Sequence, residues 1–438
     1  MQAVIMAGGK GTRLVSLTKD EIPKPMAPVV GKPILEWQIE QLKINGITDI
    51  VIAVGHLGEK IKDYFGNGSR FDVRIRYYHE EEPLGSAGCL YYVKDMLDDG
   101  PFFLVFGDVL FDIDLARMKN AHREKNAETT LFVHPNAHPY DSDLVVTDAE
   151  DRVTTFDSKQ NDRSGYWYNN CVNAGLYLLD KTFCHRIIAP VKIDLEKNIL
   201  IPMAEKGERI YAYHSPEYVK DVGTPDRIAA AEKEILSGVV IARNLKNTQK
   251  AVFLDRDGTI NKHKGLVWKE EDFELYPFVA EAIGKLNRSG YLAIVITNQP
   301  VVARGLCGIE EVENIHRKME TLLGRKGVLL DDVWFCPHHP DKGYPEENPA
   351  YKIVCECRKP KIGMIDACFE KYNIDLSASW FIGDTTMDIR TGKSAGLRTA
   401  LVLTGEAGKD GKYGDIPDLV CTDMLDAVNK ILEVENGF

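Results

Sequence analysis

Residues 251–259 read AVFLDRDGT, a short apolar run that ends in two aspartates, a glycine and a threonine. Side chains alternate between the two faces of a strand, so carboxylates two residues apart lie on the same side. Asp255 can then attack a phosphorus atom while Asp257 serves as general acid and base. The alternative interpretation is a purely structural Asp-x-Asp-Gly turn.

A similar device stands near the start of the chain, where residues 3–13 read AVIMAGGKGTR. In both halves, short apolar runs alternate with segments of helical period, which is typical of parallel α/β sheets. We predict strands at 3–7, 50–54, 102–106, 130–133, 251–254, 292–296 and 380–382, and helices at 32–45, 226–236 and 279–288. The predicted organisation is α/β throughout, with domains at 1–238 and 250–438 and a linker at 239–249.

Composition limits the class of protein. A chain of 438 residues exceeds what one hydrophobic core usually organises, and 44% apolar with 27% charged residues is typical of a globular protein. The net charge of −12 argues against a nucleic-acid partner. No apolar stretch approaches the length of about 18 residues that a membrane helix needs.

Two further features concern the compartment. Residues 1–6 enter a strand-like run with no basic region or cleavage site, so we expect a cytoplasmic protein without a membrane partner. Nine cysteines are an odd number, which argues against a disulfide framework and favours thiols or metal ligands.

The first half carries the residues of a nucleoside triphosphate site. Glycines let backbone N–H groups surround a polyphosphate, and an arginine at the end of the turn adds a fixed cation. This turn contains Gly8, Gly9, Gly11, Thr12 and Arg13. Pro23 and Pro25 hold Lys24 in a stiff segment close behind it. A plain turn and an exposed linker lysine are the alternatives.

Two carboxylates complete this predicted site. Asp108 ends an apolar run, where open α/β sheets bind ligands, and Asp221 precedes a glycine turn. Carboxylate oxygens suit Mg²⁺, which bridges phosphates. Each acid alone is more often a cap or turn residue, but their joint occurrence with the loop and Lys24 favours a metal site.

Six segments, in order, resemble the sugar-phosphate nucleotidyltransferases: 8–14, 23–25, 82–88, 107–108, 173–175 and 221–223. The resemblance implies a Rossmann-like, GT-A-like domain in which a sugar 1-phosphate oxygen attacks the α-phosphorus of a nucleoside triphosphate and expels pyrophosphate. It implies that Arg13 and Lys24 hold phosphates, that Asp108 and Asp221 hold Mg²⁺, and that Glu82 and Gly85 lie near the base. Asn173 would contact the sugar and Lys159 its phosphate, although the family often has Glu-Lys where this chain has Ser158-Lys159. A solvated loop lysine is the alternative for Lys159.

The second half resembles the haloacid dehalogenase superfamily from about residue 248 onward, because the pair at 255 and 257 is followed in order by Thr297-Asn298, Arg358-Lys359 and Gly383-Asp384. The resemblance implies a Rossmann-like domain and an aspartyl-phosphate on Asp255, with Asp257 protonating the leaving oxygen. Thr297 and Asn298 would bind the phosphoryl group, and Lys359 would stabilise the nucleophile. Mg²⁺ would be held by Asp255, the backbone carbonyl of Asp257, and Asp384.

A cysteine and histidine pattern predicts a zinc loop in this half. Cys336-Pro337-His338 is followed by Cys355-Glu356-Cys357. Three thiolates and one imidazole satisfy tetrahedral Zn²⁺ with no vacant position, the composition of a structural site. His339 is an alternative ligand to His338, and isolated buried cysteines are the structural alternative.

Such a loop resembles those of heptose 1,7-bisphosphate phosphatases and histidinol phosphatases. The segments 297–299 and 303–305 agree with the heptose group, in which Arg304 and Arg358 would contact substrate. Two departures are Pro300-Val301-Val302 in place of a serine-glycine start, and Thr385 in place of a lysine or arginine.

The fusion suggests one pathway. Segments 23–29 and 111–115 resemble heptose 1-phosphate guanylyltransferases. We therefore expect removal of the 7-phosphate from D-glycero-D-manno-heptose 1,7-bisphosphate, then transfer of GMP from GTP to give GDP-heptose for surface polysaccharide (lipopolysaccharide) synthesis. The expected partners are small molecules only, with or without assembly into a homo-oligomer; ATP or CTP are the alternative nucleotides. A mannose 1-phosphate guanylyltransferase fused to a histidinol-phosphate phosphatase is one alternative, and a regulatory nucleotide-sugar sensor is another.

Overall fold

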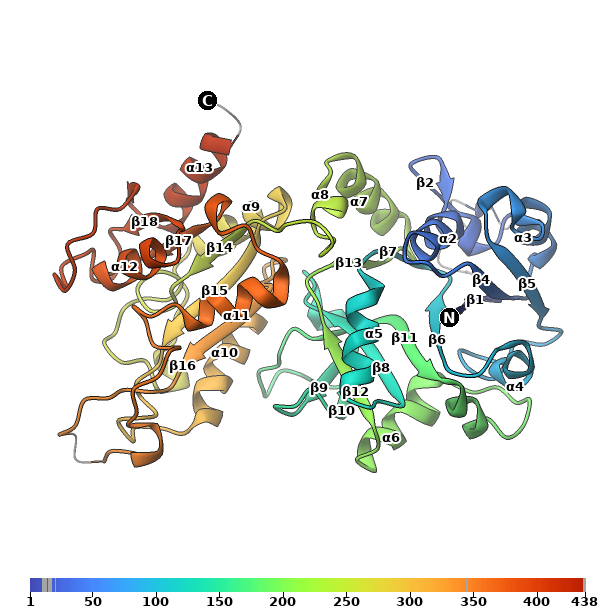
Figure 1. Cartoon of the computed structure of the whole chain (residues 1–438), viewed down its shortest axis with the longest axis horizontal. Helices are drawn as coiled ribbons and strands as arrows, with labels where there is room; N and C mark the ends of the chain where they lie inside the picture. Colours follow the sequence, from blue (N-terminus) through green and yellow to red (C-terminus); the bar gives the residue numbers. More distant parts are fainter. Residues whose placement is uncertain (10–13, 15–17, 20, 344–345, 436–438) are drawn as a thin grey trace. The chain divides into compact units, whose positions relative to one another are not determined.

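The structure, a computed structural model, describes residues 1–9, 14, 18–19, 21–343 and 346–435 (Figure 1). It forms two compact units. The N-terminal unit comprises Met1–His134, Ser142–Lys159 and Cys171–Asn244. The C-terminal unit comprises Pro135–Asp141, Gln160–Asn170 and Leu245–Phe438. Each unit is built around its own sheet.

The N-terminal unit has a nine-stranded sheet whose main path runs β10-β9-β11-β6-β1-β4-β5, with β8 beside β11 and β12 beside β8. These strands are β1 (Gln2–Ala7), β4 (Asp49–Val54), β5 (Arg74–His79), β6 (Pro101–Phe106), β8 (Thr129–His134), β9 (Leu144–Thr147), β10 (Val153–Asp157), β11 (Val172–Asp180) and β12 (Ile210–His214). Two small sheets pair β7 (Val109–Asp112) with β13 (Tyr218–Asp221) and β2 (Pro28–Val29) with β3 (Lys32–Pro33).

Apolar side chains on both faces of this sheet are buried, which explains the continuous apolar runs of β1, β4 and β6. The helices of this unit are α2 (Ile34–Ile44), α3 (Gly58–Phe65), α4 (Leu90–Val93), α5 (Leu115–Glu124), α6 (Ile201–Glu205), α7 (Pro225–Leu236) and α8 (Val239–Ala242). On one face, Leu35 and Ile39 of α2 and Ile61 of α3 pack against alternate residues of the central strands.

The C-terminal unit has a six-stranded parallel sheet in the order β16-β15-β14-β17-β18-β19. Its strands are β14 (Ala251–Leu254), β15 (Leu292–Asn298), β16 (Asp332–Cys336), β17 (Trp380–Gly383), β18 (Arg398–Val402) and β19 (Leu419–Cys421). The strand order reverses on the two sides of β14, and ligands of open α/β sheets bind at the carboxyl ends of strands at such a point.

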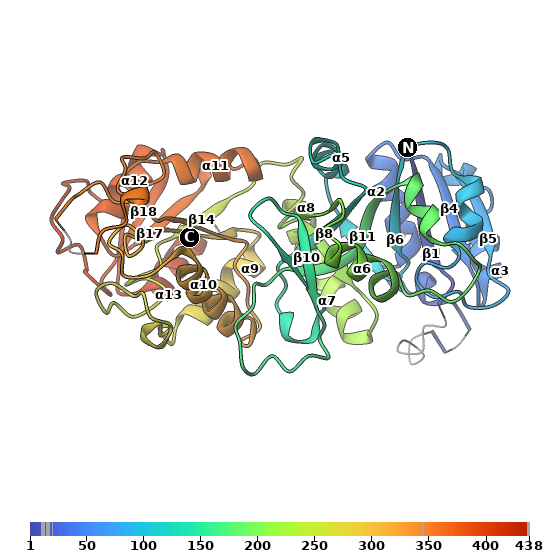
Figure 2. The ribbon, with the colours of Figure 1, turned by 90° about the horizontal axis from the view of Figure 1, so that it is seen from below.

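Helices cover both faces of this parallel sheet (Figure 2). One face carries α9 (Val279–Ser289), α10 (Ile309–Gly324) and α13 (Met424–Glu435), and the other carries α11 (Gly363–Tyr372) and α12 (Thr386–Ser394). Two hydrophobic clusters result, one on each face.

Two stretches from the first half of the sequence complete the C-terminal unit by packing on α10. The Oγ1 atom of Thr321 accepts from the backbone N–H of Tyr168 and donates to its carbonyl, both at 3.1 Å. The backbone N–H of Asn170 donates to Glu320 at 3.2 Å. Pro139 lies so close to Gly324 that a Cβ there would come within 2.6 Å of the proline ring. The aromatic segment around Tyr168 therefore packs against α10.

The predicted α/β class is confirmed, and every predicted strand and helix is present with small shifts at the ends. The expectation of parallel sheets holds for the C-terminal unit but is wrong for part of the N-terminal sheet, where β11 is antiparallel to β6, β8 and β9. Strand polarity depends on connections between distant segments, which apolar runs do not record. The segment 239–249 contains α8, and the division between units falls after Asn244. Among the described residues, no helix has the length and apolar character required to cross a membrane.

Candidate active sites

In the C-terminal unit, three carboxylates converge at the carboxyl ends of adjacent strands. Asp255 follows β14, Asp384 follows β17, and Asp388 lies in the first turn of α12. One oxygen of each lies within 4.8 Å of the others, and all three residues are buried. Because β14 and β17 are parallel neighbours, the strand ends place the first two acids together.

Lys359 lies between two of these acids. Its Nζ donates to Asp255 at 2.7 Å and to Asp388 at 2.6 Å, and its side chain is 3% exposed. Burial raises the pKa of Asp255 to about 7, although the ammonium of Lys359 opposes this shift. Burial and the charges of Asp255 and Asp388 raise the pKa of Asp384 to about 8.

The charge of this cluster fits a divalent cation. Three carboxylates face one ammonium, and Oδ1 of Asp384 is buried with no hydrogen-bond partner in the described part of the chain. Its Oδ2 accepts from the backbone N–H of Glu406 at 2.7 Å. Gly258, at φ +87°, allows the backbone to pass Asp384, because a Cβ there would lie 2.2 Å from the carboxylate. An oxygen-rich site with an unused ligand atom is what Mg²⁺ requires.

The other predicted residues of this half surround the cluster. Thr297 is buried at the end of β15, and the side-chain amide of Asn298 bonds both the backbone N–H and the carbonyl of Lys359, at 3.0 and 3.1 Å. Arg358 donates to the carbonyl of His338 at 3.0 Å, which connects the segment of Lys359 to the segment that carries the cysteines. Arg304 is half-buried and lies on the loop before α10.

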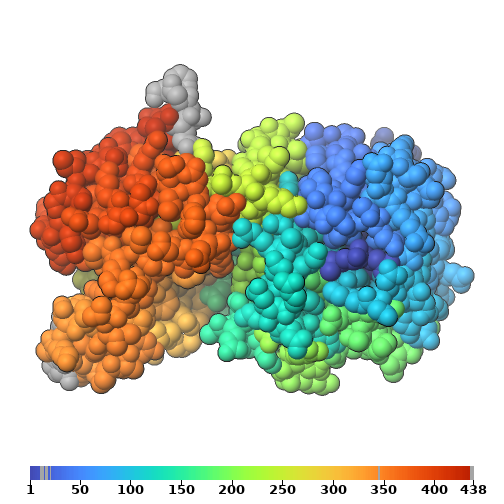
Figure 3. Space-filling model, viewed as in Figure 1, coloured from blue at the N-terminus to red at the C-terminus, as the bar shows by residue number. Residues whose placement is uncertain are grey.

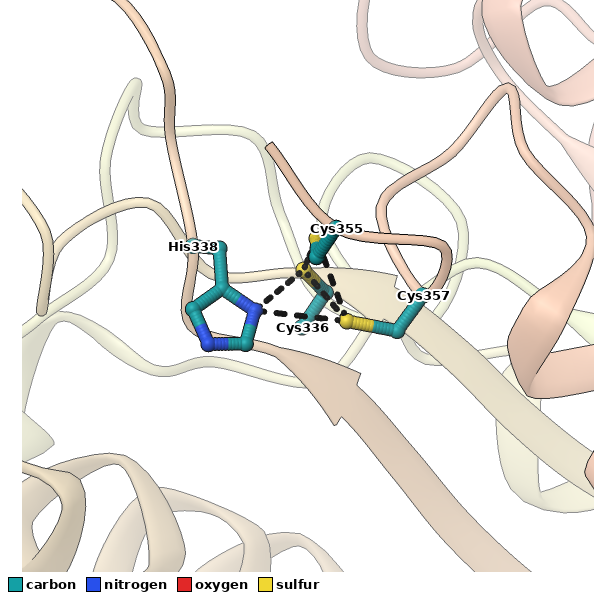
Figure 4. Close-up of side chains that lie close together, drawn as sticks. All are labelled: Cys336, His338, Cys355 and Cys357. Atoms are coloured by element: carbon teal, nitrogen blue, oxygen red, sulfur yellow. Dashed lines mark hydrogen bonds between the residues drawn. The ribbon is translucent and has the colours of Figure 1, made fainter. Parts of the chain in front are cut away.

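The predicted zinc ligands point toward one another (Figure 4). The Sγ atoms of Cys336, Cys355 and Cys357 are 3.2–3.6 Å apart, and Nδ1 of His338 lies 3.3 Å from Cys357. His339 stands outside the cluster, since its Nδ1 accepts from the backbone of Asp341. These spacings suit a closed tetrahedral site. In the segment between β16 and α11, residues 341–343 and 346–358 are exposed or half-buried at the surface of the C-terminal unit (Figure 3).

The two acids predicted to bind Mg²⁺ in the N-terminal unit lie on adjacent segments. Strand β13 pairs with β7 so that Asp221 stands opposite Val109, and Val222 N–H donates to the carbonyl of Asp108 at 2.9 Å. Each carboxylate has its own cation: Asp108 forms an ion pair with Lys24, and Asp221 accepts from Arg227 at 2.6 Å. The acids are thus neighbours, and among the described residues each pairs with a different cation.

Next to Gly8, in the glycine-rich turn, the structure places Glu80, a residue to which the sequence analysis assigned no role. The carboxylate of Glu80 lies against Gly8, where a Cβ would come within 1.9 Å of its Oε2, and burial raises its pKa. Glu82 is exposed. Gly85, at φ +78°, makes its close approach to the carbonyl of Ile193, where a Cβ would be 2.4 Å away.

The predicted sugar-side residues differ in their surroundings. Asn173 donates to Tyr177 at 2.9 Å and to Glu196 at 2.6 Å, and burial raises the pKa of Glu196. Lys159 is half-exposed and lies 3.5 Å from Asp143.

Each half of the chain matches a known protein family. Residues 2–238, more than half of the chain, match the nucleotidyl transferase family. This chain is a member of that family. Residues 356–427 match the HAD-hydrolase-like family. The mannose-1-phosphate guanylyltransferase of Mycobacterium tuberculosis is 31% identical over 240 residues, which are 55% of this chain and 66% of that protein.

The second half of this nucleotidyl transferase family member has its own relatives. The D-glycero-beta-D-manno-heptose-1,7-bisphosphate 7-phosphatase of Haemophilus ducreyi is 38% identical over 183 residues, 41% of this chain and 97% of that protein, so this half belongs to the same phosphatase family. The crystal structure of HddC from Yersinia pseudotuberculosis covers 53% of this chain and 99% of its own, at 23% identity and a TM-score of 0.47. Both family resemblances drawn from the sequence are confirmed. We refer below to the transferase unit and the phosphatase unit.

Sequence reasoning missed four residues of these sites. Asp388 follows Asp384 by one helical turn, a spacing that could have revealed it. Glu80, Glu196 and Arg227 have no local signal, since only the folded chain brings them to Gly8, Asn173 and Asp221. The predicted residues Gly11, Thr12 and Arg13 lie outside the described residues, whereas Gly9 is exposed.

Proposed function

We propose that this chain is a bifunctional enzyme of nucleotide-heptose synthesis. The phosphatase unit removes the 7-phosphate of D-glycero-D-manno-heptose 1,7-bisphosphate, and the transferase unit transfers GMP from GTP to the heptose 1-phosphate. The proposal is carried by the buried cluster of Asp255, Asp384 and Asp388 around Lys359, in a unit whose relatives are named for this bisphosphate.

In the phosphatase reaction, the carboxylate of Asp255 attacks phosphorus and the heptose oxygen leaves with a proton from Asp257. Lys359 orients Asp255 and favours its ionised form, and the segment of Thr297 and Asn298 receives the phosphoryl oxygens. Mg²⁺ held by Asp255, Asp384 and the Asp257 carbonyl would neutralise phosphoryl charge when bound. Arg304 and Arg358 are the cations we assign to the remaining substrate phosphate.

In the transferase reaction, an oxygen of the sugar 1-phosphate attacks the α-phosphorus in line with departing pyrophosphate, so positioning and charge neutralisation supply most of the catalysis. Lys24 and Arg13 hold phosphates. Asp108 and Asp221 are the residues that would hold Mg²⁺, which would neutralise charge at the α-phosphate when bound. Asn173 and Glu196 would bind hydroxyl groups of the sugar, and Lys159 would bind its phosphate.

Glu80 is the residue that we assign to the base. Guanine presents two adjacent donors, N1–H and the N2 amino group, which one carboxylate accepts together. Adenine has no such donor pair. The position of Glu80 beside Gly8 and the guanylyltransferase among the relatives support GTP as the substrate.

The remaining assignments concern metals, compartment and product. We assign Zn²⁺ to Cys336, His338, Cys355 and Cys357 as a structural ion. Free thiols and the use of GTP and sugar phosphates suit the cytoplasm. The product, GDP-heptose, is a donor for surface polysaccharide synthesis, and the partners are small molecules.

One assay tests the whole proposal. Full-length protein receives heptose 1,7-bisphosphate as the sole sugar with GTP, ATP, CTP or UTP, and phosphate and pyrophosphate are followed separately. We expect phosphate in every reaction and pyrophosphate with GTP only, after phosphate release has begun. A preference for mannose 1-phosphate with histidinol phosphate would replace the heptose assignment, and release of neither product would leave a nucleotide-sugar sensor.

A further inference from the structure

The carboxylate of Asp257 is held by donors from three neighbouring residues. Nη2 of Arg256 lies 3.0 and 2.7 Å from its two oxygens. Asn261 donates to Oδ1 at 2.9 Å and Gln299 donates to Oδ2 at 2.8 Å. A side chain with both oxygens bonded in this way has one preferred rotamer, although Asp257 itself is 20% exposed.

Arg256 is the most unusual member of this set because its side chain is fully buried. Burying a guanidinium is costly unless its donors are satisfied. Nη1 meets Nε2 of His316 at 3.2 Å, and burial together with Arg256 lowers the pKa of His316 well below its usual value, so the neutral ring accepts this bond. Nε of Arg256 has no partner among the described residues, but Nη1 and Nη2 are held inside the unit, so the guanidinium does not turn to bind a substrate phosphate.

Gln299 connects this arginine to the catalytic groups. Its Oε1 accepts from Arg256 at 3.0 Å, while its Nε2 donates to Asp257 and, at 3.0 Å, to the hydroxyl of Thr297. The amide has one favourable orientation, because reversal would place its oxygen against a carboxylate and its NH₂ against a guanidinium. Gln299 is 1% exposed, so water does not replace these bonds.

We propose that Arg256 and Gln299 are positioning residues that hold Asp257 in the orientation for proton transfer. The inference rests on the proposed phosphatase function. As the bond from Asp255 to phosphorus forms, the bond from phosphorus to the heptose oxygen breaks, and the proton of Asp257 passes to that oxygen. In the second step Asp257 takes a proton from the water that attacks phosphorus, and the Asp255 carboxylate is released.

The choice of leaving group separates this role from a general structural one. A heptose alkoxide is a poor leaving group and depends on the proton of Asp257, whereas p-nitrophenolate leaves without one. Nucleophilic attack by Asp255 is needed for both substrates. A defect confined to the position of Asp257 therefore affects the sugar phosphate far more than p-nitrophenyl phosphate.

The experiment compares kcat for both substrates in the full-length protein and in Gln299→Leu, Arg256→Lys and Asp257→Asn. Asp257→Asn sets the full effect, on the order of 10²-fold or more on the heptose bisphosphate. We expect Gln299→Leu to lose at least about tenfold more on the heptose bisphosphate than on p-nitrophenyl phosphate. Arg256→Lys, which retains the charge but not the fork, should show the same selectivity.

Ser379→Ala is the matched control. Ser379 is buried and bonds Ala251 N–H at 2.9 Å, but it is not among the residues that contact Asp257, so any loss should be equal for both substrates. Thermal unfolding and pyrophosphate release check the fold of every variant, and Gln299→Leu serves if Arg256→Lys does not fold. Equal losses on both substrates in Gln299→Leu would overturn this inference alone. A wild-type chain that releases phosphate from neither substrate would overturn the proposed function and this inference with it.

Discussion

The two units arrange their candidate catalytic acids in different ways. In the phosphatase unit, Asp255 and Asp388 share one buried ammonium, that of Lys359. In the transferase unit, Asp108 and Asp221 each have a separate cation, and the side chain of Asp221 is 41% exposed. The acids of the phosphatase unit are held in place by a buried cation. Those of the transferase unit are more exposed, and each pairs with a cation of its own.

The difference follows from the chemistry that each unit is proposed to perform. A carboxylate that forms a covalent bond must be held in place before substrate arrives, and a buried lysine does this. A site for nucleotidyl transfer receives several negative charges together with their metal ion, so its acids need only be neighbours. The burial of the acids therefore indicates whether a cation of the protein or an incoming metal ion with its substrate completes the site.

Asp255→Asn gives the largest expected effect and tests whether the sites are separate. Loss of the nucleophile should reduce phosphate release by a factor on the order of 10⁴ or more. Pyrophosphate release from GTP and heptose 1-phosphate should continue at the wild-type rate. Loss of both activities would contradict two independent sites.

Asp108→Asn is the converse test. Removal of one of two metal acids should reduce pyrophosphate release on the order of 10²-fold or more. Phosphate release from the heptose bisphosphate provides the internal control. If the rate of pyrophosphate release is unaffected, the proposed metal site of the transferase unit is wrong.

Disruption of the Cys and His cluster tests whether the assigned zinc ion is needed to hold the segment of Arg358 and Lys359 in place. Cys357→Ser should lower the bound zinc measured by atomic emission from one per chain to well below one, and phosphate release should fall on the order of tenfold because Arg358 is tied to His338. Cys307→Ser, a half-buried thiol outside the cluster, is the matched control. Equal zinc content in the two variants would exclude this assignment.

Glu80→Gln tests the proposed base contact in the transferase unit. With one fewer acceptor for guanine, kcat/KM for GTP should fall about tenfold. The wild-type preference for GTP over ITP, which lacks the N2 amino group, should also shrink. Glu82→Gln, at an exposed position, should behave as wild type; the reverse pattern would return the role to Glu82.

The last prediction concerns stability, with the smallest expected effect on either activity. It tests Glu320, an acid that, unlike Asp255, has no lysine ion pair in the described part of the chain. Burial raises its pKa to about 7, so the folded state holds a proton that the unfolded state releases above pH 4.5. The free energy of unfolding should therefore decrease between about pH 4.5 and 7 on account of this group. Glu320→Gln should raise stability by up to about 3 kcal/mol at pH 8 and leave it nearly unchanged at pH 4.5, as measured by urea unfolding. Equal changes at both pH values would contradict the assigned ionisation.

The sequence was sufficient for those parts of the sites whose residues stand at strand ends. Asp255 and Asp384 follow apolar runs that become adjacent parallel strands, so their meeting could be predicted. The spacing of Cys336 and His338, and of Cys355 and Cys357, likewise allowed their cluster to be predicted. Glu80, Glu196 and Arg227 could not be found in this way, because their partners lie on segments whose position only the three-dimensional fold determines. The antiparallel course of β11 was unpredictable for the same reason.

The phosphatase unit is assembled from three separate stretches of chain, two of which, 135–141 and 160–170, interrupt the transferase sequence. A gene cut at residue 245 would thus yield a fragment with the side of α10 around Thr321 uncovered. Recombinant dissection of the activities is therefore better attempted with point substitutions than with truncation.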